Sequence, residues 1–379
     1  MLYSEVEEDL RASVRALLAD RGPWIATLAR CETDQPYDIA LWKALAADLG
    51  CAGLAVPEEY GGAGASWREV AVVAEEIGRA VAPVPFLTSA VIATAAVLAL
   101  DDEPIARELA QRLATGETTV VPVIALSTAP DAPFPSAVRA NTHGRLTGSV
   151  TSVADSGYAD LLLVPAMTES GEPALYVVDV ETADVVSGLT CVAVPALDLT
   201  RPLYDVTLAD APARLVAQGD RAVAAYRRSL TTGAAILASE QLGVAEAALE
   251  LALGYLKTRH QFGRLIGSYQ GLKHRAADLW ASVAQARAVA RYAAACVADD
   301  DPDAPVAVAL AQAFCSGTAV RAAEECVQFH GGIGFTWEHP AHLYLKRAKS
   351  TSIALGTAAR HRAALGRLVD LQPAPAQAD

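Results

Sequence analysis

The stretch YLKTRHQFGRLIGSYQGLKHRAADL, from Tyr255 to Leu279, is the most informative part of the sequence. It ends a long segment whose apolar residues recur at intervals of three and four: Leu242, Ala245, Leu249, Leu253 and Leu256. This spacing predicts a long helix with one apolar face. Gly263 is typical of the position that follows a helix C-terminus, so we expect the helix to end there.

The end of this predicted helix carries residues suited to a phosphorylated ligand. Arg259 offers a planar guanidinium, which binds phosphate oxygens in a bidentate manner. Gln261 and Phe262 follow it directly and add an amide and an aromatic ring. An ordinary surface ion pair of Arg259 is the simpler alternative. We interpret the three residues as a candidate site for a diphosphate and its attached rings.

A second informative stretch is CVQFHGGIGFTWEHPAHLYLKRAK, from Cys326 to Lys349. Gln328 precedes the pair Gly331 and Gly332. Glycines let the backbone approach a flat ligand closely, although they can also simply turn the chain. We treat Gln328, Gly331 and Gly332 as a second part of the same candidate site.

The order of predicted elements indicates an α+β fold. Residues 1–115 read as an N-terminal helical domain, with a glycine-rich loop at AVPEEYGGAGAS and a helix that Ser66 caps with Glu69. Residues 116–225 contain short β-branched runs with short connections, which favour an antiparallel β domain. Residues 226–370 are helical again, with a loop at DDDPDAP, and residues 371–379 are predicted to be a disordered tail.

Composition excludes several classes of function. The formal net charge of −14 makes nucleic acid an unfavourable partner. The six cysteines and seven histidines show no spacing typical of a metal site, so no metal is expected. No apolar run looks long enough for a membrane span and no targeting segment is evident, so we expect a cytoplasmic protein.

Taken together, the two stretches and the α–β–α order resemble the acyl-CoA dehydrogenase family over essentially the whole chain. The resemblance implies that family's fold, with a C-terminal four-helix bundle, and FAD as cofactor. It also implies that Arg259 and Phe262 reach the FAD diphosphate of a neighbouring subunit, and that the Gln328 segment contacts its adenosine side. The run FTWEHPAHLYLKRAK looks like the actinobacterial branch that oxidises steroid and other bulky CoA thioesters.

The family's catalytic base is missing from the pattern. Most members carry Glu-Gly-Thr after the second stretch, and here the matching residues are Leu355-Gly356-Thr357. Some members place the base near the start of the long helix, which corresponds here to Gly233 and Ala234. Glu240 is the nearest carboxylate and the weak alternative candidate; a helix-face ion pair is its simpler interpretation. We expect no catalytic residue in this chain.

A second departure lies in the β domain. Family members that are active carry a Thr-Glu-Pro-x-x-Gly-Ser-Asp segment against the flavin ring, whereas residues Ile124 to Ala140 read IALSTAPDAPFPSAVRA. The chain resembles the base-lacking subunit of heteromeric, α2β2 steroid-CoA dehydrogenases. We therefore expect FAD shared at an interface with a homologous subunit that carries the glutamate, an acyl-CoA substrate, and an electron-transfer flavoprotein or similar acceptor.

Three alternatives remain open. One is a self-sufficient homotetrameric acyl-CoA dehydrogenase with a displaced base such as Glu240. Another is a flavin monooxygenase or oxidase on the same fold, which needs no base but should retain the flavin-ring segment. The third is a scaffold without flavin, which would not need the residues around Arg259 and Gln328.

Overall fold

The N-terminal third of the chain is helical. In the computed structural model, which describes residues 2–33, 35–181 and 188–371, its elements are α1 (Glu5–Arg21), α2 (Trp24–Cys31), α3 (Ile39–Lys43), η1 (Ala44–Asp48), η2 (Cys51–Gly53), η3 (Glu58–Tyr60), α4 (Trp67–Ala80), η4 (Phe86–Ala93), α5 (Thr94–Leu98) and α6 (Pro104–Ala114). Ser66 caps α4 in a capping box with Glu69, as predicted. Of the predicted tail, residues 372–379 lie outside the described residues.

The middle of the chain forms one mixed sheet. Its strands are β1 (Val120–Pro122), β2 (Val138–Ala140), β3 (Leu146–Ala154), β4 (Leu161–Met167), β5 (Pro173–Asp179), β6 (Leu189–Val194), β7 (Leu203–Ala211) and β8 (Arg214–Gln218), with the short turn η5 (Ser156–Tyr158). The strand order is β6-β7-β3-β2-β4-β5-β8, and β1 pairs with β4. Only the β1–β4 and β2–β4 pairs among the described strands are parallel, which confirms a mostly antiparallel sheet.

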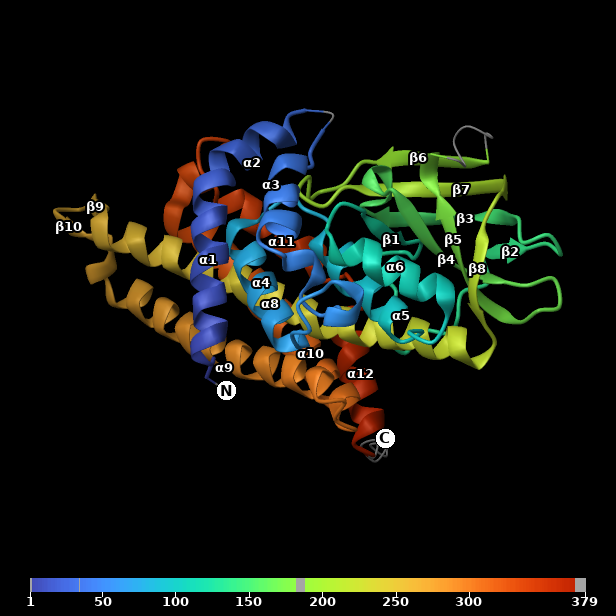
Figure 1. The fold of residues 1–379 in the computed structure, drawn as a ribbon. Coiled ribbons are helices and arrows are strands. Elements are labelled where there is room, and N and C mark those ends of the chain that lie inside the picture. The colour runs from blue at the N-terminus through green and yellow to red at the C-terminus, as the bar shows by residue number, and fades with distance from the viewer. Residues whose placement is uncertain (1, 34, 182–187, 372–379) are drawn as a thin grey trace, which may run out of the picture.

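The C-terminal part is a helical bundle built around one long helix. It contains α8 (Asp220–Thr258), β9 (His260–Gln261), β10 (Arg264–Leu265), η6 (Ile266–Ser268), α9 (Gln270–Ala298), α10 (Ala304–His330), η7 (Gly331–Phe335), α11 (Ala341–Thr351) and α12 (Ala358–Leu368). In Figure 1, α8 runs from beneath the sheet to the β9–β10 hairpin at the opposite end of the molecule. It therefore links the sheet to the segment that carries Arg259.

One prediction about this region needs correction. The long helix ends at Thr258 rather than at Gly263, because the chain turns into the β9–β10 hairpin. It also begins at Asp220, inside the predicted middle domain; the division of the chain into domains stays a prediction.

One described helix, Ala304–Phe335, is long and apolar enough to cross a membrane by length and composition alone, whereas the sequence predicted no such segment. In its most apolar window 61% is buried inside the protein, and α10 packs against both α8 and α9. A core helix passes the same test, so this is weak evidence for a span.

Candidate functional site

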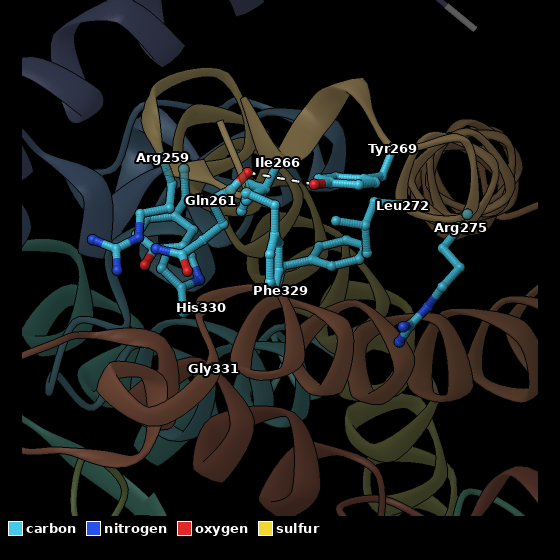
Figure 2. A pocket seen from close by; sticks show the side chains of 12 residues that line it. Arg259, Gln261, Ile266, Tyr269, Leu272, Arg275, Phe329, His330 and Gly331 are labelled. Carbon is cyan, nitrogen blue, oxygen red and sulfur yellow. Dashed lines mark hydrogen bonds between the residues drawn. The ribbon is translucent and has the colours of Figure 1, made fainter. Parts of the chain in front are cut away.

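A pocket of about 610 Å³ lies where the end of α8 meets the end of α10. Figure 2 shows the side chains of the β9–β10 hairpin and of the start of α9 above the C-terminus of α10. The lining residues are Tyr255, Arg259, Gln261, Phe262, Ile266, Tyr269, Gly271, Leu272, Arg275, Phe329, His330 and Gly331. The pocket thus combines aromatic walls with two arginines, and it brings the two informative stretches of sequence together.

Arg259 is available to bind a ligand. Its side chain is exposed and makes no hydrogen bond or ion pair with the described residues, in contrast to Arg275, which pairs with Glu325 at 2.6 Å. An unpaired guanidinium at the rim of an aromatic pocket is suited to phosphate oxygens. The simpler interpretation of Arg259 as part of a surface ion pair therefore has no support in the described part of the chain.

Phe262 lies at the tip of the β9–β10 hairpin, where the chain reverses in two residues. Phe262 and Gly263 have φ of 52° and 77°, the conformation that a two-residue hairpin turn requires. Glycine adopts it readily, but a bulky residue does so at a cost in free energy. The Phe262 side chain is 90% exposed, so its packing within this chain does not offset that cost. Both facts indicate a contact outside the chain.

The second stretch also reaches the pocket, though not with every predicted residue. Gly331 lines it, with φ of 62°, while Gln328 and Gly332 are exposed on the same segment but outside the lining. A Cβ atom on Gly331 or Gly332 would have no atom within 4 Å, so these glycines leave open space beside the pocket. Aromatic walls, a free guanidinium and this open backbone fit an adenine dinucleotide such as FAD.

The predicted position of the catalytic base is apolar and closed. Leu355 is fully buried in the main hydrophobic core with Ile92, Leu126 and Ala234. Its backbone N–H donates to the Leu126 carbonyl at 2.7 Å, and its carbonyl lies 2.8 Å from Nε2 of His361. The leucine side chain at this position cannot accept a proton from a substrate.

The proline-rich segment that replaces the flavin-ring segment packs onto the same region. Asp131 forms ion pairs of 2.7 Å with both Arg360 and Arg367 of α12. Ala129 lies so close to Gly356 that a Cβ atom on that glycine would be 2.8 Å from the Cβ of Ala129. At Ala129 and Asp131, the proline-rich segment therefore packs against the C-terminal part of the chain.

Glu240 forms ion pairs from α8, as its simpler interpretation expected, and it is buried. Oε2 accepts from Arg201 at 2.7 Å, and Oε1 accepts from Arg347 at 2.8 Å. Burial alone would raise the pKa of this carboxyl, but the two guanidinium groups outweigh burial and lower the pKa. A carboxylate held in this way is a poor general base.

Several pocket residues were not predicted. Tyr255, Tyr269, Phe329 and Arg275 lie within or next to the quoted stretches, and the 5.3 Å stacking of Arg275 on Phe329 joins α9 to α10. Their aromatic and cationic character was visible in the sequence, but which helix faces meet was not. Among the described residues, no group of His, Cys, Asp and Glu could hold a metal ion, and the expectation of no metal remains a prediction.

Comparison with known proteins agrees with this architecture. Residues 4–117 match the acyl-CoA dehydrogenase N-terminal domain, and residues 223–369 match the acyl-CoA dehydrogenase C-terminal domain. The chain belongs to the acyl-CoA dehydrogenase family.

Individual proteins of known sequence or structure are similar to this chain over nearly its whole length. The chain is 33% identical over 353 residues to acyl-CoA dehydrogenase IpdE2 of Mycolicibacterium smegmatis, covering 93% of this chain and 95% of the relative. It resembles the ChsE4–ChsE5 complex of Mycobacterium tuberculosis, with a TM-score of 0.84, 30% identity and coverage of 98% and 99% of the two chains. A variant of the Tcur3481–Tcur3483 steroid acyl-CoA dehydrogenase gives a TM-score of 0.82 at 29% identity, with coverage of 97% and 98%.

Proposed function

We propose that this chain is the non-catalytic subunit of a heteromeric, FAD-dependent acyl-CoA dehydrogenase that desaturates a bulky acyl-CoA. Its role would be to complete the FAD site of a homologous subunit that carries the glutamate base. One similar structure is the ChsE4–ChsE5 complex and another is the Tcur3481–Tcur3483 steroid acyl-CoA dehydrogenase, which supports both the heteromer and a steroid-type substrate.

The observation that carries the proposal is the contrast between two regions of the chain. The base position is filled by the buried Leu355, whereas Arg259 and Phe262 stand exposed at a pocket without a partner in the described chain. A chain that catalysed the reaction alone would need space and a base at the position of Leu355. A chain that completes a neighbour's FAD site needs only the pocket with Arg259 and Phe262.

Several pocket residues then have a defined role in binding FAD. Bound FAD would supply the hydride acceptor, and its ring would lie with the partner's catalytic residues. Arg259 would bind the diphosphate, and the aromatic walls formed by Phe329 and Tyr269 would hold the adenosine side and exclude water. The backbone at Gly331 would lie against the ligand without a side chain between them.

The alternatives have less support. A self-sufficient enzyme with Glu240 as base would need a carboxylate free to take a proton, but Glu240 is bound by two arginines. A flavin monooxygenase or oxidase should keep the flavin-ring segment, which is here a proline-rich loop. A scaffold without flavin gives no reason for the unpaired Arg259 or the strained Phe262.

The test is the flavin content of the purified protein. The chain expressed alone should bind little or no FAD, and its complex with a co-expressed, glutamate-bearing homologue should contain one FAD per heterodimer. The absorbance of released flavin, divided by protein concentration, measures both. One tightly bound FAD per chain in the isolated protein would contradict the proposal.

We further propose a cytoplasmic location, with an electron-transfer flavoprotein or similar protein as acceptor.

A further inference from the structure

The segment between α10 and α11 presents large apolar side chains to solvent. Phe335 is 75% exposed and Trp337 is 48% exposed, and Ile333 beside them is exposed as well. The segment begins at Gly331, which lines the pocket proposed for FAD, so these side chains follow directly along the chain from that site. Exposed aromatic residues in a row on a chain with a net charge of −14 mark a surface that another molecule covers.

A buried histidine beneath this surface lacks hydrogen bonds. His342, at the start of α11, is more than nine-tenths buried, yet neither of its ring nitrogens has a hydrogen-bond partner in the described chain. The Trp337 ring meets it edge-on, with ring centroids 4.8 Å apart, and the Lys346 ammonium lies 4.4 Å from the Trp337 centroid. A buried polar group without a partner costs free energy, and such groups in native proteins have a reason.

We propose that Phe335 and Trp337 are the aromatic anchors by which this chain docks on the glutamate-bearing subunit, and that His342 gains its hydrogen bond only in that complex. The inference rests on the proposed function, since it names the surface through which the two subunits would meet. Trp337 covers His342 in the free chain. When the Trp337 ring turns onto the partner, His342 becomes accessible to an acceptor or donor on the partner surface.

A protein partner fits this surface better than a small molecule does. The anchors stand out from the chain instead of lining a cavity, and tryptophan is among the residues that dominate protein–protein binding energy. Phe262, 90% exposed at the hairpin tip, lies across the same pocket and extends the surface. We propose a homologous, glutamate-bearing subunit as this partner because the chain is similar to the ChsE4–ChsE5 complex and to Tcur3481–Tcur3483.

The test compares two double variants in a binding experiment with a glutamate-bearing homologue that forms a complex with the wild-type chain. Phe335→Ser with Trp337→Ser removes the anchors. Val192→Ser with Leu197→Ser is the matched control, because these residues are 57% and 61% exposed, Val192 in the edge strand β6 and Leu197 in the segment that follows it. We expect the anchor variant to bind roughly 30-fold more weakly or worse, following the size of typical hot-spot effects. The control should bind as the wild type does.

A third variant tests the histidine with effects of opposite sign. His342→Phe keeps a ring of similar size without polar atoms. It should raise the melting temperature of the isolated chain and weaken the complex by roughly tenfold, as expected for one lost hydrogen bond. Equal binding of His342→Phe and wild type would overturn the role of His342. Equal binding of the anchor variant and wild type would overturn the docking surface, while the absence of any complex with the wild-type chain would overturn the proposed function together with this inference.

Discussion

Gly233 on α8 faces Leu355 across the interior: a Cβ atom on Gly233 would lie 3.2 Å from Cδ1 of Leu355 and 2.8 Å from Cγ1 of Ile92. The family resemblance predicts the catalytic base at one of these two positions, and the two residues lie side by side. Neither carries a carboxylate, so the predicted absence of the base concerns one buried region rather than two separate ones.

Introducing a glutamate at position 355 should not create activity. In Leu355→Glu the new carboxylate would be buried without a partner, and we expect a loss of at least about 2 kcal/mol in the free energy of unfolding. Chemical denaturation of the isolated chain measures this loss. Leu355→Met, which conserves volume, should cost less than about 1.5 kcal/mol. Dye reduction with a CoA thioester by the isolated Leu355→Glu chain would show that the flavin-ring region is intact after all.

Removing Arg259 should weaken flavin retention without unfolding the protein. The guanidinium is exposed and unpaired in the described chain, so its loss affects the ligand alone. A charge-assisted hydrogen bond contributes about 1.5–3 kcal/mol, which predicts roughly ten- to hundredfold weaker FAD binding by the Arg259→Ala complex. Lys257→Ala, at an exposed charge in the last turn of α8, is the control. Unchanged flavin content after dialysis of the Arg259→Ala complex would place Arg259 outside the site.

The fold could be predicted from sequence because its signals are local. Ser66 and Glu69 predict the start of α4, and the apolar stripe from Leu242 to Leu256 predicts a long buried helix. The predicted end of that helix at Gly263 was wrong, because Phe262 adopts a left-handed conformation inside a hairpin. A bulky residue is rarely found in that conformation, so local rules place the glycine at a helix end instead.

The site could be predicted only where one segment carries it. Arg259, Gln261 and Gly331, which line the pocket, could be named from the sequence because each lies in a recognisable motif. The burial of Glu240 was missed, since Arg201 and Arg347 are 39 and 107 residues away in sequence. Long-range ion pairs leave no spacing pattern, and neither does the edge-on contact between the rings of His342 and Trp337.

The histidines near the docking surface predict how stability depends on pH. Burial, together with the charges of His330 and His342, lowers the pKa of His339 to about 4. The pKa in the unfolded chain is about 6.5. Between these values the unfolded chain binds a proton that the folded chain does not, so the unfolding free energy falls as pH drops from about 6.5 to 4.

His339→Asn should reduce this dependence, because asparagine keeps an acceptor for the Ala341 N–H without a titrating group. Urea unfolding of the isolated chain at pH 7.5, 6 and 5 measures it, with His143→Asn, at an exposed loop position, as control. Identical slopes of unfolding free energy against pH for His339→Asn and wild type would be evidence against this assignment.

Glu240→Gln separates a structural role of this carboxylate from a catalytic one. Glu240 lies between Arg201 and Arg347, and Arg347 in turn is 3.0 Å from Asp198 and donates to the Ala82 carbonyl at 3.2 Å. This buried network connects the bundle to the sheet and to the N-terminal helices. Removing one charge from a buried pair leaves its partners uncompensated, which costs about 3–5 kcal/mol.

We therefore expect Glu240→Gln to lower the unfolding free energy of the isolated chain by roughly 3 kcal/mol. Glu250→Gln, on the same helix but at an exposed ion pair with Arg79, should cost less than about 1 kcal/mol. Turnover per bound flavin in the assembled complex should stay close to that of the wild type, because the lowered pKa and the two arginines make Glu240 unable to take a substrate proton efficiently. If Glu240 were the base, turnover would fall by roughly a hundredfold or more while flavin content stayed constant. Measuring flavin content and dye reduction on the same sample distinguishes the two, since a structural defect lowers both in proportion and the loss of a base lowers only the rate.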